Sequence, residues 1–348
     1  MTEIMKKKNC LFSLVLLWGF VLSGCYMINT LPVPNPAGFH YIAGYYDKGG
    51  AFHSGDFPFS GPVTGMASDG SMIVAVGEEG TIAYSKDCMV WTVAEEKLPV
   101  VFSSLTWGEG VFFAGGDSGH AAWSADGIHW NRGVIGPMSP GDIYAVAAGK
   151  IAGKSVFVAA GAGGRIAFSE GGPQGRWSMA TLTPFGTEGD SSETVRAVAF
   201  GTVKTGSIFV AAGDNGKIAF ASDLTGKWYG GRTGISRAFN GIAFGGDRFS
   251  AVGEMGMIKF SSVPKSYSWA PGDGNIFGVR PLLGITYDPL VKQFVAYGAD
   301  SVVGFSEYGD SWTAATFRSL FPAGISAAAC TASRIVFGGS DGTIAYSN

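Results

Sequence analysis

The chain has 348 residues, of which 46% are hydrophobic, 15% are charged and 55 are glycine. This composition excludes an intrinsically disordered protein, and a net charge of −3 excludes nucleic-acid binding driven by electrostatics. Because the glycines follow neither a collagen-like period nor a low-complexity tract, they indicate a fold with many tight turns.

The first 24 residues predict a secretory signal that is not part of the fold. A basic start at Lys6–Lys8 precedes an apolar run, Leu11–Val21, that is too short to span a bilayer. The run ends in Leu22-Ser23-Gly24-Cys25, which resembles the lipobox of bacterial lipoproteins. The resemblance implies cleavage before Cys25 and diacylglycerol on its sulfur, and two or more acyl chains hold a protein on a membrane. The alternative is an ordinary signal peptide followed by an incidental cysteine.

Residues 25–38 predict a lipidated tether, because the run Leu31-Pro-Val-Pro-Asn-Pro-Ala37 is stiff and extended. Removal of residues 1–24 takes away three lysines and one glutamate and changes the net charge from −3 to −5. We expect an extracytoplasmic protein of the bacterial cell envelope, and Tyr26 after the cysteine favours the outer membrane where there is one. Cys88 and Cys330 could pair in an oxidising compartment, but two unpaired, mostly buried thiols are the preferred interpretation.

A nine-residue phrase recurs seven times from Gly77 onward, at intervals of 39, 45, 52, 40, 45 and 41 residues. This spacing is typical of four-stranded propeller blades. The sequence therefore predicts one all-β domain over residues 39–348, a monomeric seven-bladed β-propeller with four-stranded antiparallel blades. An open β-solenoid is the alternative, but solenoid repeats are shorter and end in atypical copies. The copies are GEEGTIAYS at Gly77, GDSGHAAWS at Gly116, GAGGRIAFS at Gly161, GDNGKIAFA at Gly213, GEMGMIKFS at Gly253, GADSVVGFS at Gly298 and GSDGTIAYS at Gly339.

Three strands of each unit are predicted around this phrase. A small–apolar–small–large run, as in Ser104–Trp107 and Ala197–Phe200, predicts the innermost strand, because seven blades crowd around one axis. A second apolar strand runs into the first glycine of the phrase. The G-x-x-G element predicts a two-residue hairpin turn whose central residues have positive φ, and a third strand ends at the closing serine.

A tryptophan begins the predicted fourth strand, and a short loop with serine and aspartate connects it to the third. Ser85, Asp87 and Trp91 follow the pattern S-x-D-x-x-x-W. These loops resemble the Asp-box of sialidase-type (BNR-repeat) propellers, in which Asp and Ser cap a tight turn and Trp packs between sheets. The resemblance supports the fold and implies a structural role. The further members are Ser124, Asp126, Trp130, Asp223, Trp228, Ser306 and Trp312.

The seventh copy ends at Ser347 and Asn348 without a tryptophan strand. Counting the usual separation back from Gly65 reaches the stretch from Tyr45 to Phe52. We therefore expect this N-terminal stretch to supply the outer strand of the last blade, so that the ring is closed and no strand edge stays exposed.

Acidic residues occupy the central turn positions in six of the seven copies. A ring of carboxylates at the channel mouth would attract a cation or a basic partner. The alternative is turn propensity, which favours Asp and Asn without any ligand, although it favours Glu less. This candidate binding ring comprises Glu78, Glu79, Asp117, Asp214, Glu254, Asp300 and Asp341.

Long connections between blades are expected on the same face, and variable loops on a rigid scaffold usually carry binding specificity. They contain apolar side chains that either face a partner or cover the core. These are Phe185, Tyr229, Phe277, Phe317, Leu320 and Phe321.

No catalytic, metal or cofactor motif stands out. The Arg-Ile-Pro element of sialidases is missing, and the arginines occupy unmatched places in their repeats. The four histidines show no metal-ligand spacing. The favoured hypothesis is a lipid-anchored propeller, not an enzyme and without a cofactor, that binds a protein or envelope partner through its loop face. It is similar to the photosystem II stability/assembly factor family, although that family's arginine patch is not found here. The alternative is a carbohydrate-binding or glycoside-hydrolysing propeller of the Asp-box type.

Overall fold

The computed structural model describes residues 53–54, 58–95, 100–186, 193–223, 225–231, 233–264 and 269–347. These residues belong to one unit, His40–Asn348. The predicted signal segment, Cys25 and the tether lie outside the described residues. Within the described ranges, none of the helices has the length and apolar character needed to cross a membrane.

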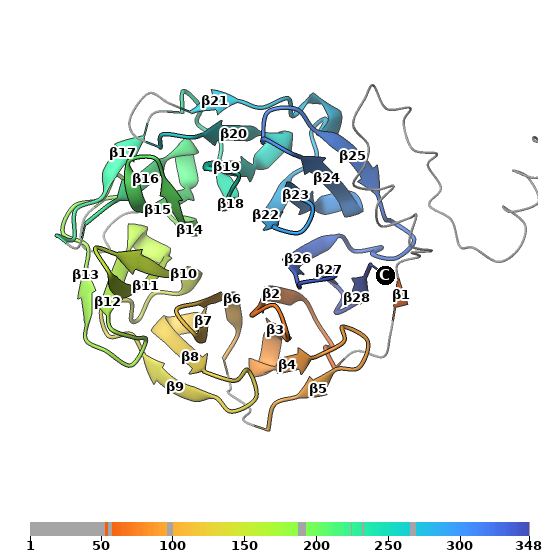
Figure 1. Ribbon diagram of the computed structural model, residues 1–348, viewed down its shortest axis with the longest axis horizontal. Coiled ribbons are helices and arrows are strands. Elements are labelled where there is room, and N and C mark those ends of the chain that lie inside the picture. The colour runs from red at the N-terminus through yellow and green to blue at the C-terminus, as the bar shows by residue number, and fades with distance from the viewer. Residues whose placement is uncertain are drawn as a thin grey trace, which may run out of the picture. The chain divides into compact units, whose positions relative to one another are not determined.

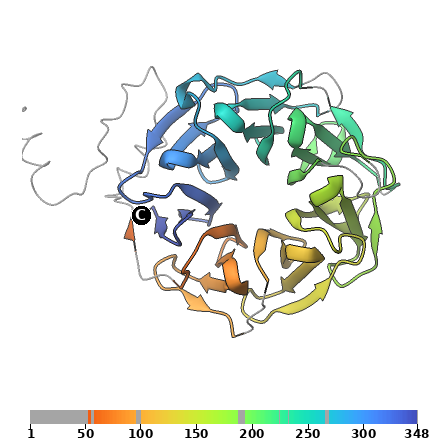
Figure 2. The ribbon, with the colours of Figure 1, turned by 180° about the vertical axis from the view of Figure 1, so that it is seen from behind.

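The described strands form seven four-stranded antiparallel sheets arranged as blades around a common axis (Figures 1 and 2). This confirms the predicted seven-bladed propeller. The strands nearest the axis are β2 (Val63–Ser68), β6 (Phe102–Gly108), β10 (Ile143–Ile151), β14 (Val195–Val203), β18 (Phe239–Gly245), β22 (Leu282–Asp288) and β26 (Ile325–Cys330). The second strands are β3 (Ile73–Gly77), β7 (Val111–Gly116), β11 (Lys154–Gly161), β15 (Gly206–Gly213), β19 (Arg248–Gly253), β23 (Gln293–Gly298) and β27 (Ile335–Gly339).

The two outer positions of each blade follow the predicted third and fourth strands. The third strands are β4 (Ile82–Ser85), β8 (His120–Ser124), β12 (Ile166–Glu170), β16 (Ile218–Ala221), β20 (Ile258–Ser261), β24 (Val302–Ser306) and β28 (Ile344–Tyr346). The fourth strands of blades 1 to 6 are β5 (Thr92–Val93), β9 (Asn131–Val134), β13 (Trp177–Met179), β17 (Tyr229–Gly231), β21 (Ala270–Pro271) and β25 (Thr313–Thr316). Each begins at its predicted tryptophan or one residue after it.

The hydrophobic core lies between neighbouring blades. Val74 and Val76 of blade 1 share one cluster with Phe112 and Trp130 of blade 2. Every residue of β3 is buried, as expected for a second strand packed on both faces. Each large side chain buried in this way stabilises the fold by about 1.5–3 kcal/mol. The same type of cluster joins blade 7 to blade 1, so the packing also connects the last blade to the first.

The last blade has its own arrangement at the outer position. The two-residue strand β1 (His53–Ser54) pairs antiparallel with β28, with His53 opposite Tyr346 and Ser54 opposite Ala345. Figure 1 shows β1 beside the C-terminal end of the chain. The predicted stretch from Tyr45 to Phe52 lies outside the described residues, so that assignment stays a prediction.

The turn between the second and third strands differs from the predicted two-residue hairpin. The N–H of Gly77 donates to the carbonyl of Thr81 at 3.1 Å, which leaves three loop residues, the short helix η1 (Glu78–Gly80). Positive φ occurs at the second and third of them, at Glu79 (54°) and Gly80 (67°). Gly80, the third loop residue, closes the loop in the left-handed region of φ, which is why glycine recurs at this third position. The equivalent turns are η2 (Asp117–Gly119), η3 (Ala162–Gly164), η4 (Asp214–Gly216), η5 (Glu254–Gly256) and η7 (Ala299–Ser301).

Candidate functional site at the channel mouth

The turns between second and third strands lie at the same end of the ring as the connections that lead into the inner strands. The N–H of Asp117 donates to the carbonyl of Val101 at 3.0 Å, and the N–H of Asp214 donates to the carbonyl of Thr194 at 3.0 Å. We call this end of the ring the mouth face. The predicted placement of the acidic turns beside these connections is therefore confirmed.

A β-bulge occurs at the same position of all seven inner strands. Val63 pairs with Gly77 and Gly65 pairs with Val76, so Thr64 is an extra residue without a partner in the ladder. A bulge of this type leaves one residue unpaired and re-aims its side chain. All seven extra residues line the central cavity, and together we call them the bulge ring: Thr64, Ser103, Tyr144, Arg196, Asn240, Leu283 and Ser326.

Three members of the bulge ring connect adjacent blades through the backbone. The Thr64 hydroxyl donates to the carbonyl of Phe102, Asn240 Nδ2 donates to the carbonyl of Leu282 at 2.9 Å, and the Ser326 hydroxyl donates to the carbonyl of Val63 at 2.7 Å. In each case the carbonyl belongs to the next blade around the ring. We call Thr64, Asn240 and Ser326 the latch residues. Their hydrogen bonds stabilise the contacts between inner strands.

The other large members of the bulge ring are exposed at the mouth. Tyr144 is 38% exposed, Leu283 is 39% exposed, and the Arg196 side chain is 42% exposed. Burial and the nearby Asp142 carboxylate raise the pKa of Tyr144, whose hydroxyl donates to Asp142 Oδ2 at 3.2 Å. Blades 3, 4 and 6 thus present an aromatic, a cationic and an aliphatic side chain around one opening.

Below the bulge ring, the inner strands form successive layers around a cavity of about 580 Å³. The first layer contains only small residues. Gly65 permits the inner strands of blades 1 and 2 to approach, since a Cβ there would lie 2.8 Å from the backbone nitrogen of Leu105. This layer comprises Gly65, Ser104, Ala145, Ala197, Gly241, Gly284 and Ala327, all of which line the cavity. The predicted small–apolar–small–large order is confirmed.

The far end of the cavity is aromatic on four blades. Trp107, Phe200, Phe244 and Tyr287 line it, each half-buried. Each ring also packs against a phenylalanine of its own second strand, with centroids 4.5 to 5.1 Å apart. Phe200 lies over Gly149 of the preceding blade, which has no side chain to displace it. The cavity is therefore lined by polar and charged residues at the mouth, by small residues in the next layer and by aromatic residues at the far end on four blades.

The structure places the predicted acidic residues on the mouth face, but their surroundings differ. Asp214 Oδ1 accepts a hydrogen bond from Arg196 Nε at 2.6 Å. Asp300 Oδ1 accepts one from Arg318 Nη2 at 3.0 Å, and Asp300 Oδ2 lies 3.7 Å from Arg280 Nε. Glu254 accepts from the N–H of Ala238, and Asp341 from the N–H of Thr343. Within the described residues, the carboxylates of Glu78, Glu79 and Asp117 have no such partner. Among the described members of the ring, arginine therefore neutralises Asp214 and Asp300, whereas the carboxylates of blades 1 and 2 have neither a cation nor an N–H partner.

Sequence analysis missed the placement of the arginines. Arg237 and Arg280 both stand two residues before an inner strand, and Arg196 lies one residue inside another. Arg280 and Arg318 contact different oxygens of one carboxylate, that of Asp300. The interpretation that arginines occupy unmatched places is wrong for Arg237 and Arg280, because the repeat must be aligned on the inner strand rather than on the glycine phrase.

The apolar loop residues divide between core and surface. Phe185, Phe277, Phe317 and Phe321 are fully or almost fully buried and cover the core, whereas Tyr229 is 47% exposed and Leu320 is half-buried. The exposed apolar groups of the mouth face are others. Val279 is 72% exposed, and η5, which contains Met255, contacts both η6 (Asn275–Phe277) and β22. We call Met255, Ile276, Val279 and Leu283 the apolar patch.

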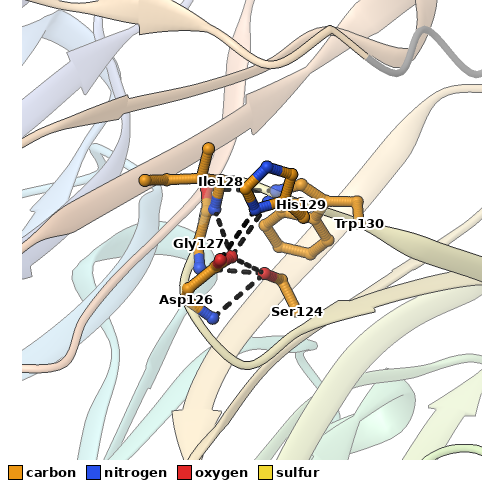
Figure 3. A network of polar contacts seen from close by, with 6 residues as sticks. All are labelled: Ser124, Asp126, Gly127, Ile128, His129 and Trp130. Carbon is orange, nitrogen blue, oxygen red and sulfur yellow. Dashed lines mark hydrogen bonds and ion pairs between the residues drawn. The ribbon is translucent and has the colours of Figure 1, made fainter.

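The serine–aspartate–tryptophan loops are structural and lie at the other end of the ring from the η turns. Asp126 Oδ1 accepts the N–H groups of Ile128 and His129 at 2.9 Å each, and the Ser124 hydroxyl at 2.9 Å (Figure 3). Trp130 Nε1 donates to the carbonyl of Gly127, and its ring is buried. The His129 side chain first, and then these N–H groups, lower the pKa of Asp126. Backbone N–H groups likewise lower the pKa of Asp87, and the Thr225 side chain lowers that of Asp223.

The remaining members of these loops occupy equivalent places. The Ser85 hydroxyl donates to Asp87 at 3.1 Å, and Ser306 accepts the N–H of Gly309 at 2.8 Å. Trp228 and Trp312 are buried, and Trp91 is half-buried.

Cys88 and Cys330 are free thiols, and burial raises the pKa of both. Among the residues that the structure describes, no group of three His, Cys, Asp or Glu could hold a metal ion.

These observations define a seven-bladed propeller whose mouth face carries polar, charged and apolar side chains around the channel. No family model and no curated protein matches the sequence. The chain is similar to YCF48 from Cyanidioschyzon merolae (15% identity, TM-score 0.63, covering 86% of this chain and 98% of that one). It is similar to YCF48 bound to D1 peptide (15%, 0.64, 85% and 94%) and to a chain of the Mitotic Checkpoint Complex (11%, 0.67, 93% and 97%). At these identities the likeness shows the fold, which many functions share.

Proposed function

We propose that this chain is a membrane-anchored, extracytoplasmic binding protein that holds a segment of another protein against its mouth face. The observation that carries the proposal is the group of three large, exposed bulge residues, Tyr144, Arg196 and Leu283, around one opening. Tyrosine and arginine are enriched among the residues that dominate binding energy at protein interfaces.

The apolar patch extends this surface beyond the channel. Leu283 belongs to both the bulge ring and the patch, and Val279 is the most exposed large apolar side chain of the described residues. Arg280 and Asp300 flank the patch with charged groups. An exposed apolar surface with a polar rim is typical of a protein interaction site. One of the similar structures, YCF48 bound to D1 peptide, is a propeller of this fold in complex with a peptide, which supports the same type of ligand here.

The cavity gives no support to the glycoside-hydrolase alternative. Hydrolysis by paired carboxylates requires two Asp or Glu side chains across the bound sugar. Among the described residues that line the cavity, none is Asp or Glu. We therefore propose binding as the primary role, with turnover of a glycan as the outcome that would contradict it.

The anchor and the closure of the ring belong to the same proposal. Lipidation of Cys25 after removal of residues 1–24 would hold the propeller at a membrane surface, and residues 25–38 would separate it from the lipid. Metabolic labelling with an alkyne-modified fatty acid should mark the wild type and not Cys25→Ala. The pairing of β1 with β28 supports closure by the N-terminal segment.

Crosslinking in intact cells followed by quantitative mass spectrometry tests the binding face. Tyr144→Ala and Leu283→Ala should each lower the recovery of a specific partner about tenfold, because they remove central contacts. Leu290→Ala is the matched control, since Leu290 is 51% exposed and follows the opposite end of β22. Equal recovery with all three variants, or hydrolysis of a glycan panel by the wild type, would contradict the proposal.

A further inference from the structure

The cavity itself has a chemistry that the binding of a protein at the mouth does not require. Of the described residues that line it, Arg196 is the one with a formal charge at neutral pH. All others are small, aliphatic, thioether, aromatic, hydroxyl-bearing or amide side chains. A volume of about 580 Å³ lies within the range of small-molecule sites, which combine an apolar lining with a few placed polar groups.

Arg196 retains donors that can face the cavity. Its Nε donates to Asp214 Oδ1 at 2.6 Å, and Nη1 donates to Asn240 Oδ1 at 3.4 Å. These two contacts fix the plane of the guanidinium group and leave Nη2 without a partner among the described residues. Because a guanidinium carries five N–H donors in a rigid fork, the remaining ones match a carboxylate or a sulfonate.

The aromatic end lies at a defined separation from this charge. Arg196 and Phe200 are both on β14, and four strand residues span about 13 Å. Trp107 and Phe244 line the same end of the cavity from blades 2 and 5 and are half-buried, so part of each ring lies open. Between the two ends, Thr106 and Thr286 line the wall and are half-buried.

We propose that the cavity binds one amphiphilic organic anion, with a carboxylate or sulfonate at Arg196 and a flat aromatic body extending toward Trp107, Phe200 and Phe244. The charged head would receive charge-assisted hydrogen bonds at the mouth, and the body would replace water along the small-residue wall. This inference shares Arg196 with the proposed protein-binding face but does not rest on it, because the body of the ligand would lie below the bulge ring and not across it.

Calorimetric titration of the full chain with two matched probes tests the inference. Naphthalene-2-sulfonate is the anionic probe and 2-naphthalenemethanol is the neutral one. We expect the anion to bind at least tenfold more tightly to the wild type. Arg196→Gln should lower the affinity for the anion about tenfold and leave that for the alcohol unchanged. Arg132→Gln, which removes an exposed arginine from β9, should change neither.

Two filling variants locate the site. Thr106→Phe and Thr286→Phe narrow the cavity from blades 2 and 6, and each should abolish binding of both probes while circular dichroism and the melting temperature stay those of a folded protein. If one variant does not fold, the other gives the answer. Equal affinity of the wild type for anion and alcohol, or unchanged binding by a folded filling variant, would overturn the inference.

Discussion

At the scale of single residues, the bulge ring shows how one position serves two purposes. Thr64 and Ser326 are small and bond the next blade, whereas Tyr144 and Leu283 are large and face outward. A bulge supplies an unpaired residue in every blade, so its side chain is free to vary. Contacts between blades and exposed surface are thus provided by different members of one structural position.

The latch residues should contribute measurably to stability. Thr64→Val keeps the shape of the side chain but removes the hydroxyl that donates to the carbonyl of Phe102. We expect a loss of about 1 kcal/mol in the free energy of unfolding, because the hydrogen bond of a half-buried hydroxyl is lost. Ser103→Ala is the control, a bulge residue of blade 2 from which no corresponding loss is expected. Urea unfolding measures both, and equal midpoints would refute the latch.

Gly65 is required by the close approach of two inner strands. A Cβ at this position would lie 2.8 Å from the backbone nitrogen of Leu105, and backbone cannot move aside as a side chain can. Gly65→Ala should therefore destabilise the protein by about 1–3 kcal/mol. Gly136→Ala is the matched control, since nothing lies within 4 Å of its added Cβ and its φ is not positive. Thermal unfolding should leave the control within about 1 kcal/mol of wild type.

At the scale of elements, the serine–aspartate–tryptophan loop acts as a small independent cap. Asp126 holds two N–H groups and the Ser124 hydroxyl while Trp130 enters the cluster between blades 1 and 2. Loss of such a carboxylate cap usually costs about 0.5–2 kcal/mol. The turn and the packing of the tryptophan should therefore weaken together.

The contribution of Asp126 should depend on pH in a defined direction. Its pKa is lowered in the folded protein, so its stabilisation is fully present above the unfolded value of about 3.9 and is lost as the pH falls through the folded value. Asp126→Ala should be less stable than wild type at pH 7, and the difference should shrink below about pH 4. Asp126→Asn should retain part of the stability. A constant difference between wild type and Asp126→Ala from pH 7 to pH 3 would contradict this.

The elements were largely predictable, and the site was not. The inner-strand pattern of Ser104–Trp107, the seven phrases and the tryptophans each report a repeated physical need, namely crowding at the axis, a tight turn and packing between sheets. The bulge at Thr64 left no such mark, because an extra residue does not change the apolar pattern on either side of it. Burial of Phe185 and exposure of Val279 were equally open, since both lie in connections without periodicity.

At the scale of the whole molecule, the mouth face is electrostatically uneven. Glu78, Glu79 and Asp117 leave blades 1 and 2 negative, while Arg196 pairs with Asp214 of blade 4, and Arg280 and Arg318 pair with Asp300 of blade 6. A partner with a basic end and an apolar end would therefore bind in one orientation. The acidic side should contribute mainly to the rate of association and should weaken with salt.

The closure of the ring can be tested by proline substitution in β1. Successive N–H groups of a strand point to opposite sides, so one of His53 and Ser54 directs its N–H toward β28. Of the two single variants His53→Pro and Ser54→Pro, one should lower the melting temperature through loss of a hydrogen bond to β28, and the other should not. Ser54→Ala should match wild type. If both proline variants unfold like wild type, the N-terminal segment does not hold the last blade.

The shortness of β1 has a mechanical consequence. Tension applied through the chain that precedes His53 would enter the domain at a sheet position held by two residue pairs, whereas β28 is backed by three further pairs with β27. The outer strand would detach first and the six complete blades would stay folded. A partner that pulled the propeller away from a surface would thus separate β1 from β28 before any strand of the mouth face unfolded.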